Sequence, residues 1–457
     1  MRGAGTAREG EGRRWEASGD RPATSKRRRV GQASSAGLYQ RLTEREIDQK
    51  VSRSFARRST RERFSNLQLR LSLDIYARSA SLTGLETMME RRYRVEEICS
   101  AGDMVFGLTE NGICCAFERL SGRRTCILNK DSSEVVRSLF HNKSNGTLIT
   151  VSVESHDLYT SLRCRATPLE SLRSGDISSR VRLFEAESLR WPGFVEFDDV
   201  NGIVLTFSAT DSVYKVWSMQ DPTKVLYHLP DSNIEEIKIS PGVMMIMRTN
   251  EEGLLPLQVR CIETGKVLSE VRQEIEKDKR IDVVEQFNEK LILKQEQSPV
   301  RIIDLLNGSV VQLANQEFRK PVAFIFLYEY NCFLAFESNT VTVWDFTGNL
   351  VRHFEDHALW FPYPGLDYTS VIYITQAQDV IISICQDGAV NSNGSVDGDP
   401  SSSHISIHIS SINTGRCLAR IDPKRASDPK ISALCYNETY GEIITGNENG
   451  VLQIWSN

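Results

Sequence analysis

Two pairs of histidines, each four residues apart, are the first residues whose spacing could hold a metal ion. His353 and His357 would share one face only on a helix. The strand-like run VRHF and the prolines that follow it instead favour an extended chain. His404 and His408 lie in the alternating run HISIHIS, where the rise of a strand sets them roughly 13 Å apart. We therefore predict no metal site.

Cysteine and glycine patterns predict no catalytic or cofactor site either. The chain has ten cysteines, none of them in a C-x-x-C pair, and the adjacent Cys114 and Cys115 would point to opposite faces of a strand. We expect reduced, structural thiols. The sequence contains neither a Gly-rich phosphate loop nor a G-x-S-x-G nucleophile elbow. The prediction is a protein that is not an enzyme and has no cofactor.

The N-terminal region has an excess of basic residues. Residues 1–94 contain 22 Lys and Arg against 11 Asp and Glu, whereas the remainder contains 33 against 49. Within the basic region, Lys26, Arg27, Arg28 and Arg29 form a continuous cationic run that resembles a monopartite nuclear localisation signal. Two alternatives stay open: a solvated charge run, and an arm that contacts nucleic-acid phosphates without reading sequence.

The elements that would present these residues change along the chain. Residues 1–37 are rich in Gly, Ser, Arg and Glu with few large apolar residues, so we predict a disordered basic tail. Residues 38–92 have apolar residues near helical spacing, with Thr43 and Glu46 as a capping box. They predict amphipathic helices, which either cap the body of the protein or dock a partner.

From residue 93 the period changes to that of strands. The last stretch, 430–455, reads as ISALCYN, EIITGN and VLQIW, separated by polar turns that contain Gly or Asn. This pattern predicts a three-stranded antiparallel meander. Its order of apolar runs, Asn-Gly turn and terminal Ile-Trp resembles the second half of a WD40 repeat, and that family builds four-stranded blades of a β-propeller.

Degraded copies of the unit extend back to about residue 95. We count eight, with seven blades as the alternative, and predict an all-β, WD40-like β-propeller over residues 93–457. The last unit has three strands before the chain stops. The resemblance implies that an N-terminal strand supplies the fourth and closes the ring, and we expect this strand just before or at Tyr93–Val95.

The resemblance also implies a His–Ser/Thr–Asp–Trp hydrogen-bond network within blades, which this sequence retains only in fragments. The matching positions are Asp211, Trp217, Trp344, Asp345, His357, Asp387, Asn449 and Trp455. Asn449 stands where the family usually has Asp. We expect stability to come mainly from strand packing.

These features predict a non-catalytic scaffold for protein–protein interactions, acting within a nuclear multiprotein complex, with a cytoplasmic location as the alternative. The expected partners are other proteins, bound at the loops, at the insertion 389–403 or through the N-terminal helices. We expect neither a small-molecule substrate nor a membrane span, since no run of 18 apolar residues occurs.

Two other functions remain open. The first is a substrate receptor of a cullin-type ubiquitin ligase. The usual adaptor-docking pattern has Arg or Lys two residues after Trp-Asp, and here Phe346-Thr347 follows instead. The second is a chromatin or nucleic-acid binder that uses residues 1–94 as a basic arm, with binding that weakens as salt rises.

Overall fold

A computed structural model describes most of the chain from residue 62 onward. The described ranges are 62–77, 84–231, 233–249, 253–277, 279–305, 307–313, 323–327, 330–337, 340–354, 372–375, 377–387, 404–422 and 429–457. The predicted tail of residues 1–37, the insertion 389–403 and the first part of the predicted helical region lie outside them.

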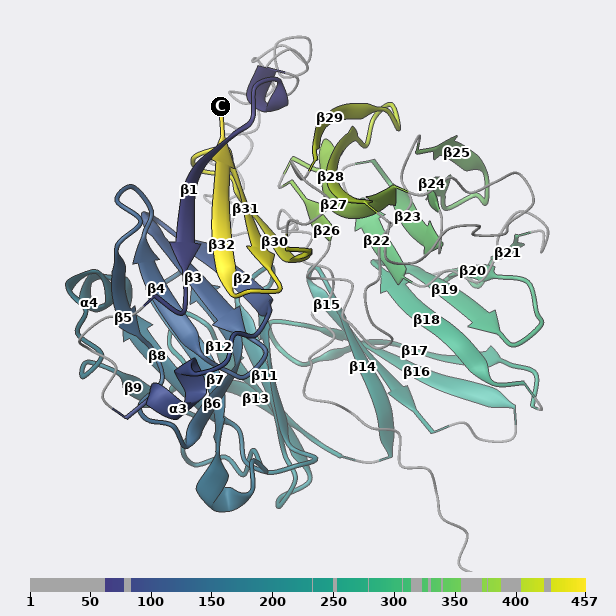
Figure 1. Cartoon of the computed structure of the whole chain (residues 1–457). Coiled ribbons are helices and arrows are strands. Elements are labelled where there is room, and N and C mark those ends of the chain that lie inside the picture. The colour runs from purple at the N-terminus through teal and green to yellow at the C-terminus, as the bar shows by residue number, and fades with distance from the viewer. Residues whose placement is uncertain are drawn as a thin grey trace, which may run out of the picture.

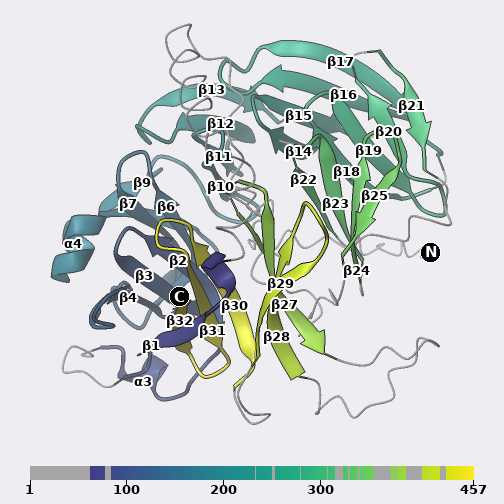
Figure 2. The same ribbon diagram turned by 90° about the horizontal axis from the view of Figure 1, so that it is seen from above.

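The described strands form eight antiparallel sheets of four strands each, arranged around a ring (Figure 2). In each of the first seven sheets the strands follow chain order. The first strands of several pairs of adjacent sheets contact one another, which places them at the inside of the ring. The first four blades are β2 (Val95–Ala101), β3 (Met104–Thr109), β4 (Cys114–Glu118) and β5 (Arg124–Ile127); β6 (Glu134–Asn142), β7 (Thr147–Glu154), β8 (Arg163–Pro168) and β9 (Val181–Leu183); β10 (Phe194–Asp198), β11 (Ile203–Ser208), β12 (Val213–Ser218) and β13 (Val225–Pro230); β14 (Ile234–Ser240), β15 (Val243–Arg248), β16 (Leu254–Cys261) and β17 (Val267–Glu274).

The second half of the ring repeats this plan. Blades 5 to 8 are β18 (Ile281–Phe287), β19 (Lys290–Gln295), β20 (Arg301–Asp304) and β21 (Val310–Gln312); β22 (Ala323–Leu327), β23 (Cys332–Glu337), β24 (Thr340–Asp345) and β25 (Leu350–His353); β26 (Ile372–Ile374), β27 (Val380–Asp387), β28 (His404–Ser411) and β29 (Cys417–Ile421); β30 (Ile431–Asn437), β31 (Glu442–Asn447), β32 (Val451–Ser456) and the N-terminal strand β1 (Gln68–Asp74). The fold is therefore an eight-bladed β-propeller. The count of eight is confirmed against the alternative of seven.

Strand β1 closes the ring. It pairs antiparallel with β32, so that Gln68 lies opposite Ser456 and Asp74 opposite Val451, and the two strands run side by side in Figure 1. The pairing covers an edge of β32 that would otherwise expose unpaired backbone groups. A non-covalent clasp between β1 and β32 thus completes the eighth blade, as the resemblance implies.

The position of β1 corrects two predictions. The predicted helical extension of residues 38–92 included residues 68–74, which are a strand. The closing strand was expected next to Tyr93–Val95, but Val95 begins β2 of the first blade. Strand formation prevails because it buries Leu73, which is 1% exposed, between blades 8 and 1. The propeller accordingly begins before residue 93.

The described part of the chain has a helical turn at residues 62–64, before β1, and short helices between strands. Helix α3 (Glu86–Met89) lies between β1 and β2, and blade 2 holds the 3₁₀ helix η1 (Ser155–Asp157) and helix α4 (Leu169–Ser174). None of the helices in these ranges has the length and apolarity that a membrane span requires.

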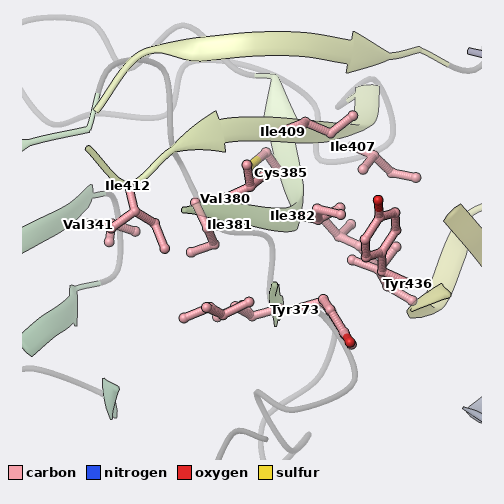
Figure 3. Close-up of a cluster of buried hydrophobic side chains, with 14 of the residues drawn as sticks. Val341, Tyr373, Val380, Ile381, Ile382, Cys385, Ile407, Ile409, Ile412 and Tyr436 are labelled. Carbon is pink, nitrogen blue, oxygen red and sulfur yellow. The ribbon is translucent and has the colours of Figure 1, made fainter. Parts of the chain in front are cut away.

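Buried apolar side chains fill every junction between blades. The clusters join blades 1 and 2 (Phe106, Leu139), 2 and 3 (Val151, Trp217), 3 and 4 (Leu205, Ile246), 4 and 5 (Leu257, Leu293), 5 and 6 (Ile302, Phe333), 6 to 8 (Val343, Ile382, Tyr436), and 8 and 1 (Ile454, Val105). Figure 3 shows part of the core of blades 6 to 8. Because the chain of cores returns to its start, the ring is closed by packing as well as by pairing.

Close approach between blades constrains individual residues. A Cβ atom on Gly446 in β31 would lie 2.5 Å from the side chain of Val95 in blade 1, so only glycine fits where blades 8 and 1 meet. Cys114 and Cys115 point into the cores on opposite sides of blade 1, as predicted. All ten cysteines are free thiols.

Candidate functional site

The tryptophans of blades 3 and 8 make the same hydrogen bond. The indole Nε1 of Trp217 in β12 donates to Thr206 Oγ1 in β11 at 2.8 Å, and that of Trp455 in β32 donates to Thr445 Oγ1 in β31 at 3.1 Å. In both blades the tryptophan lies two residues beyond the one opposite the threonine. The third strand is thereby tied to the second.

Blade 6 departs from this arrangement for a visible reason. The place of Thr206 and Thr445 is taken there by Ala335, which lies opposite Thr342 and has no hydroxyl group. Trp344 donates instead to Thr342 in its own strand, at 2.9 Å, and is 1% exposed. The bond satisfies a buried indole without linking two strands.

The predicted acidic positions lie in turns. Asp211 accepts a hydrogen bond from Ser208 Oγ at 3.0 Å in the turn after β11. Asp345 ends β24 and accepts from the backbone N–H groups of Thr347 and Asn349. Burial acts to raise the pKa of Asp345, but the hydrogen bonds from the side chains and backbone of Thr347 and Asn349 outweigh it and the pKa is lowered. The carboxylate is therefore engaged in shaping its turn.

Other predicted positions are only partly placed. In the last blade Asn447 rather than Asn449 bridges the turn, accepting from the N–H groups of residues 449 and 451. Asp387 ends β27, and only its backbone is described. His357 and the cluster Lys26, Arg27, Arg28 and Arg29 lie outside the described residues. The WD-type role of these positions stays a prediction.

The structure describes the side chain of only one member of each histidine pair, so the prediction for the two pairs stays untested. His353 ends β25, and His408 is 3% exposed with Nε2 at 2.9 Å from Ser406 Oγ. The described residues contain no group of three or more His, Cys, Asp or Glu side chains that could hold a metal ion.

The innermost strands of blades 1 to 5 carry a group of charged residues that we call the inner polar sector. Those of blades 6 to 8 are mainly apolar. The members are Glu96, Glu97, Arg137, Glu196, Glu235, Glu236, Lys238, Asp282 and Glu285. An innermost strand has a sheet neighbour on one edge only, which leaves room for polar side chains at the axis of the ring. Acids outnumber bases in this sector.

Contacts between blades organise the inner polar sector. Lys238 Nζ in β14 lies 2.8 Å from Glu236 and 3.2 Å from Glu285 of the next blade. Burial acts to lower the pKa of Lys238, but the two carboxylates outweigh it and raise the pKa, so the ammonium group stays charged. Glu97 accepts the backbone N–H of Leu139 in blade 2 at 3.2 Å. Successive blades are thus linked by ion pairs and by a hydrogen bond from a backbone N–H group at the inner edge of a first strand.

Glu96 is an acid of the inner polar sector whose pKa is raised. The cause is burial, which disfavours the charged carboxylate, with Arg94 acting in the opposite direction. The residue nevertheless keeps an exposed surface. These groups can attract or orient a charged partner.

A recess of about 380 Å³ opens on blade 4. Arg248, Pro256 and Arg272 lie next to one another across β15, β16 and β17 and line it, together with Gln258, whose amide donates to Glu270 at 2.6 Å. The lining includes no His, Cys, Lys or Asp among the described residues. It offers polar contacts but no pairing of a nucleophile with a base.

Sequence reasoning missed the inner polar sector. The runs VEEIC, IEEIK and IDVVE each begin the first strand of a repeat, where an outer or middle strand would need an apolar or alternating pattern. Charge in the first strand of successive repeats was the signal that could have indicated residues at the axis.

Comparisons with known proteins give the following matches. A family described as "Domain of unknown function (DUF7899)" matches residues 52–455. No curated protein matches. The computationally designed Ika8 protein is 16% identical, with a TM-score of 0.49, over 80% of this chain and 97% of its own. BamB from Moraxella catarrhalis is 11% identical, with a TM-score of 0.42, over 86% of this chain and 100% of its own.

Proposed function

We propose that this chain, which belongs to the family described as a domain of unknown function (DUF7899), is a non-catalytic scaffold for protein–protein interactions. The observation that carries the proposal is the closed ring of eight blades with a shared apolar core at every junction. Such a ring holds its loops in fixed positions, so a partner meets a preorganised surface and less conformational entropy is lost on binding.

We further propose that the ring is a diverged WD40-type propeller. The matching Trp217–Thr206 and Trp455–Thr445 bonds support this assignment, because a tryptophan that donates to a Ser or Thr hydroxyl is part of the hydrogen-bond network of that family. The inner polar sector would add charge selectivity at the axis of the ring.

Proximity labelling tests the scaffold function. The full chain fused to a biotin ligase is compared with the ligase alone and with a variant that lacks residues 1–61. This deletion spares β1, whereas removal of residues 1–94 would open the ring. A scaffold labels the same set of proteins with and without residues 1–61. Labelling no stronger than that of the ligase alone would contradict the proposal.

We propose a nuclear location on the basis of Lys26, Arg27, Arg28 and Arg29. Changing these four residues to alanine should remove the protein from the nucleus, as seen by live-cell imaging of the full chain. Alanine at Arg57 and Arg58, a second basic pair in the same region, is the matched control. Equal distribution of the wild type and the four-residue variant would favour a cytoplasmic scaffold.

A nucleic-acid binder is the second candidate, favoured by the excess of cations in residues 1–94. It would bind DNA or RNA with an affinity that falls steeply with salt and is lost when residues 1–61 are deleted. A cullin-ligase receptor has weaker support, because Trp344 is buried and the Asp345 carboxylate is bound within its own turn.

A further inference from the structure

Two loops beside blades 2 and 3 bring large apolar side chains to the surface. Leu158 and Tyr159, between β7 and β8, are 82% and 47% exposed, and Trp191, between β9 and β10, is 49% exposed. With the neighbouring Arg190 we call these residues the Trp191 patch. Loops that follow second strands and loops that join successive blades lie at the same end of an antiparallel meander, so both belong to one face of the ring.

Backbone contacts place the two loops side by side. The N–H of Trp191 donates to the carbonyl of Thr160 at 2.9 Å, and Arg190 forms an isolated antiparallel bridge with Ser161. The N–H of Leu162 donates to the carbonyl of Leu189. Residues about 30 positions apart in the chain therefore form one continuous surface.

The loop holds Leu158 and Tyr159 in an unfavourable backbone conformation. Their φ angles are 58° and 59°, in the left-handed region that a residue with a Cβ atom adopts only at a cost in free energy. The N–H groups of Leu158 and Tyr159 bind the carbonyls of Ser155 and Glu154, which fixes the turn. Because Leu158 is 82% and Tyr159 47% exposed, folding buries little of the apolar surface of Leu158 and only about half of that of Tyr159. Binding of a partner would bury the rest.

A buried ionic network supports the base of this loop. Arg165 contacts the carboxylates of Glu134 and Glu154, and Ser152 Oγ donates to Glu134 at 2.6 Å. Glu154 then reaches His156 Nδ1 at 2.9 Å in the exposed turn. Arg165 and Glu134 are 6% and 1% exposed. A loop anchored in this way loses little conformational freedom when it binds a partner.

The charges around the patch indicate what kind of partner fits. The acids next to it are paired: Glu154 with Arg165 and Arg163, Glu185 with Arg182, and Glu187 with Lys215 at 2.6 Å. Arg190 is exposed and has no ion-pair partner among the described residues. Asp157 is the remaining acid of the two loops, and one of its oxygens is buried. The patch thus presents two aromatic side chains and one exposed cation, Arg190, that has no ion-pair partner among the described residues, with the half-buried Asp157 as the nearest unpaired acid.

We propose that the Trp191 patch docks a protein segment in which an apolar residue is flanked by carboxylates. Trp, Tyr and Arg are the residue types that contribute most to binding at protein interfaces. Here Trp191, Tyr159 and Leu158 supply the apolar contact, and Arg190 supplies the complementary charge. The inference rests on the proposed scaffold function and names one of its binding surfaces.

A peptide array tests this specificity. Full-length protein is applied to peptides of about twelve residues in which Leu, Phe or Trp lies between Asp and Glu, and to matched sets with Lys and Arg, or Ser and Gly, in place of the acids. We expect retention on the acidic set, and binding at least about tenfold weaker for W191A and for R190E. Leu268→Ser, which changes an exposed apolar residue on the outer strand of blade 4, is the control and should bind as the wild type does.

A second variant separates binding from folding. Asparagine tolerates the left-handed conformation better than leucine or tyrosine, so the double variant L158N/Y159N should unfold at no lower urea concentration than the wild type and still lose peptide binding. Absence of acidic selectivity, or binding unchanged by W191A, overturns the proposal. Binding to vesicles of phosphatidylserine and phosphatidylcholine that is lost in the same variants would assign the patch to membranes instead, and also overturns it.

The labelling experiment distinguishes the two proposals. If the wild type and W191A label the same proteins, the scaffold function stands and the Trp191 patch is not its docking surface. If the wild type labels none, both proposals fail.

Discussion

Cys261 occupies a place that acidic residues hold in the next two blades. It ends β16 as Asp304 ends β20 and Asp345 ends β24, and the glycine of each following turn donates its N–H to the carbonyl of that residue. Burial acts to raise the pKa of Cys261. The hydroxyl of Thr264 and the N–H groups of residues 263 and 264 outweigh it, and the pKa is lowered. A turn built to accept a carboxylate also stabilises a thiolate.

Iodoacetamide should therefore modify Cys261 before the buried cysteines of the native protein. Cys115, Cys164 and Cys385 have their pKa raised to about 12 by burial, so they carry almost no thiolate at neutral pH. The alkylation rate of Cys261 should rise with pH to a plateau. The midpoint of this rise should lie below 9.0, the ordinary pKa of a cysteine thiol. Mass spectrometry of quenched samples measures each site.

Thr264→Val is the matched control for this reactivity. It removes the hydroxyl donor and should shift the alkylation midpoint of Cys261 to higher pH. A rate that is the same in the variant and the wild type would show that the turn does not tune the thiol.

The Trp217–Thr206 bond predicts a loss of stability in a second residue-scale experiment. Thr206→Val keeps the shape of the side chain but leaves the indole N–H of Trp217 without a partner, and both residues are nearly fully buried. An unsatisfied buried donor costs about 1–3 kcal/mol of unfolding free energy, measured by urea denaturation. Thr445→Val should cost less, because Trp455 is only half-buried and water can replace its partner. Equal losses would contradict this account.

At the scale of elements, most strands could be predicted and β1 could not. Asn-Gly and Thr-Gly turns between apolar runs mark the hairpins of the blades locally. In and next to β1, Leu67, Leu71 and Ile75 fit a helical period, and the alternation of Leu69, Leu71 and Leu73 within the strand fits a strand equally well. Its partner β32 lies more than 370 residues away along the chain. Only tertiary pairing decides between the two periods.

The contribution of β1 can be measured with two substitutions in the same strand. Leu73→Ala removes a side chain that is 1% exposed at the junction of blades 8 and 1, and should cost about 2–5 kcal/mol of unfolding free energy. Leu69→Ala removes one that is 37% exposed and should cost well under half as much. Similar losses in urea denaturation would mean that β1 is held by backbone pairing alone.

At the scale of the whole molecule, repeat counting predicted the ring but not its surfaces. Eight units follow from turn signals that recur along the chain. The inner polar sector and the Trp191 patch depend on which strand lies at the axis and on which loops meet, as Thr160 and Trp191 do. Such contacts leave no periodic signal in a single sequence. The predicted interaction elements at 389–403 and in the N-terminal helices lie outside the described residues.

Closure of the ring predicts that a destabilising substitution in β1 also destabilises both neighbouring blades, 8 and 1. Leu73 lies in a core shared by β30, β31 and β32 of blade 8 and by β2 to β4 of blade 1, whereas the core of blades 4 and 5 has no residue in common with it. In hydrogen exchange, Leu73→Ala should therefore speed the exchange of β1, β30–β32 and β2–β5 and leave β16 and β19 unchanged. Faster exchange in β1 alone would mean that the clasp is peripheral. A uniform change in all blades would mean that the ring opens only as a whole. The expected gradient, steepest at the clasp and absent on the far side, follows from a ring in which each blade is stabilised by its two neighbours.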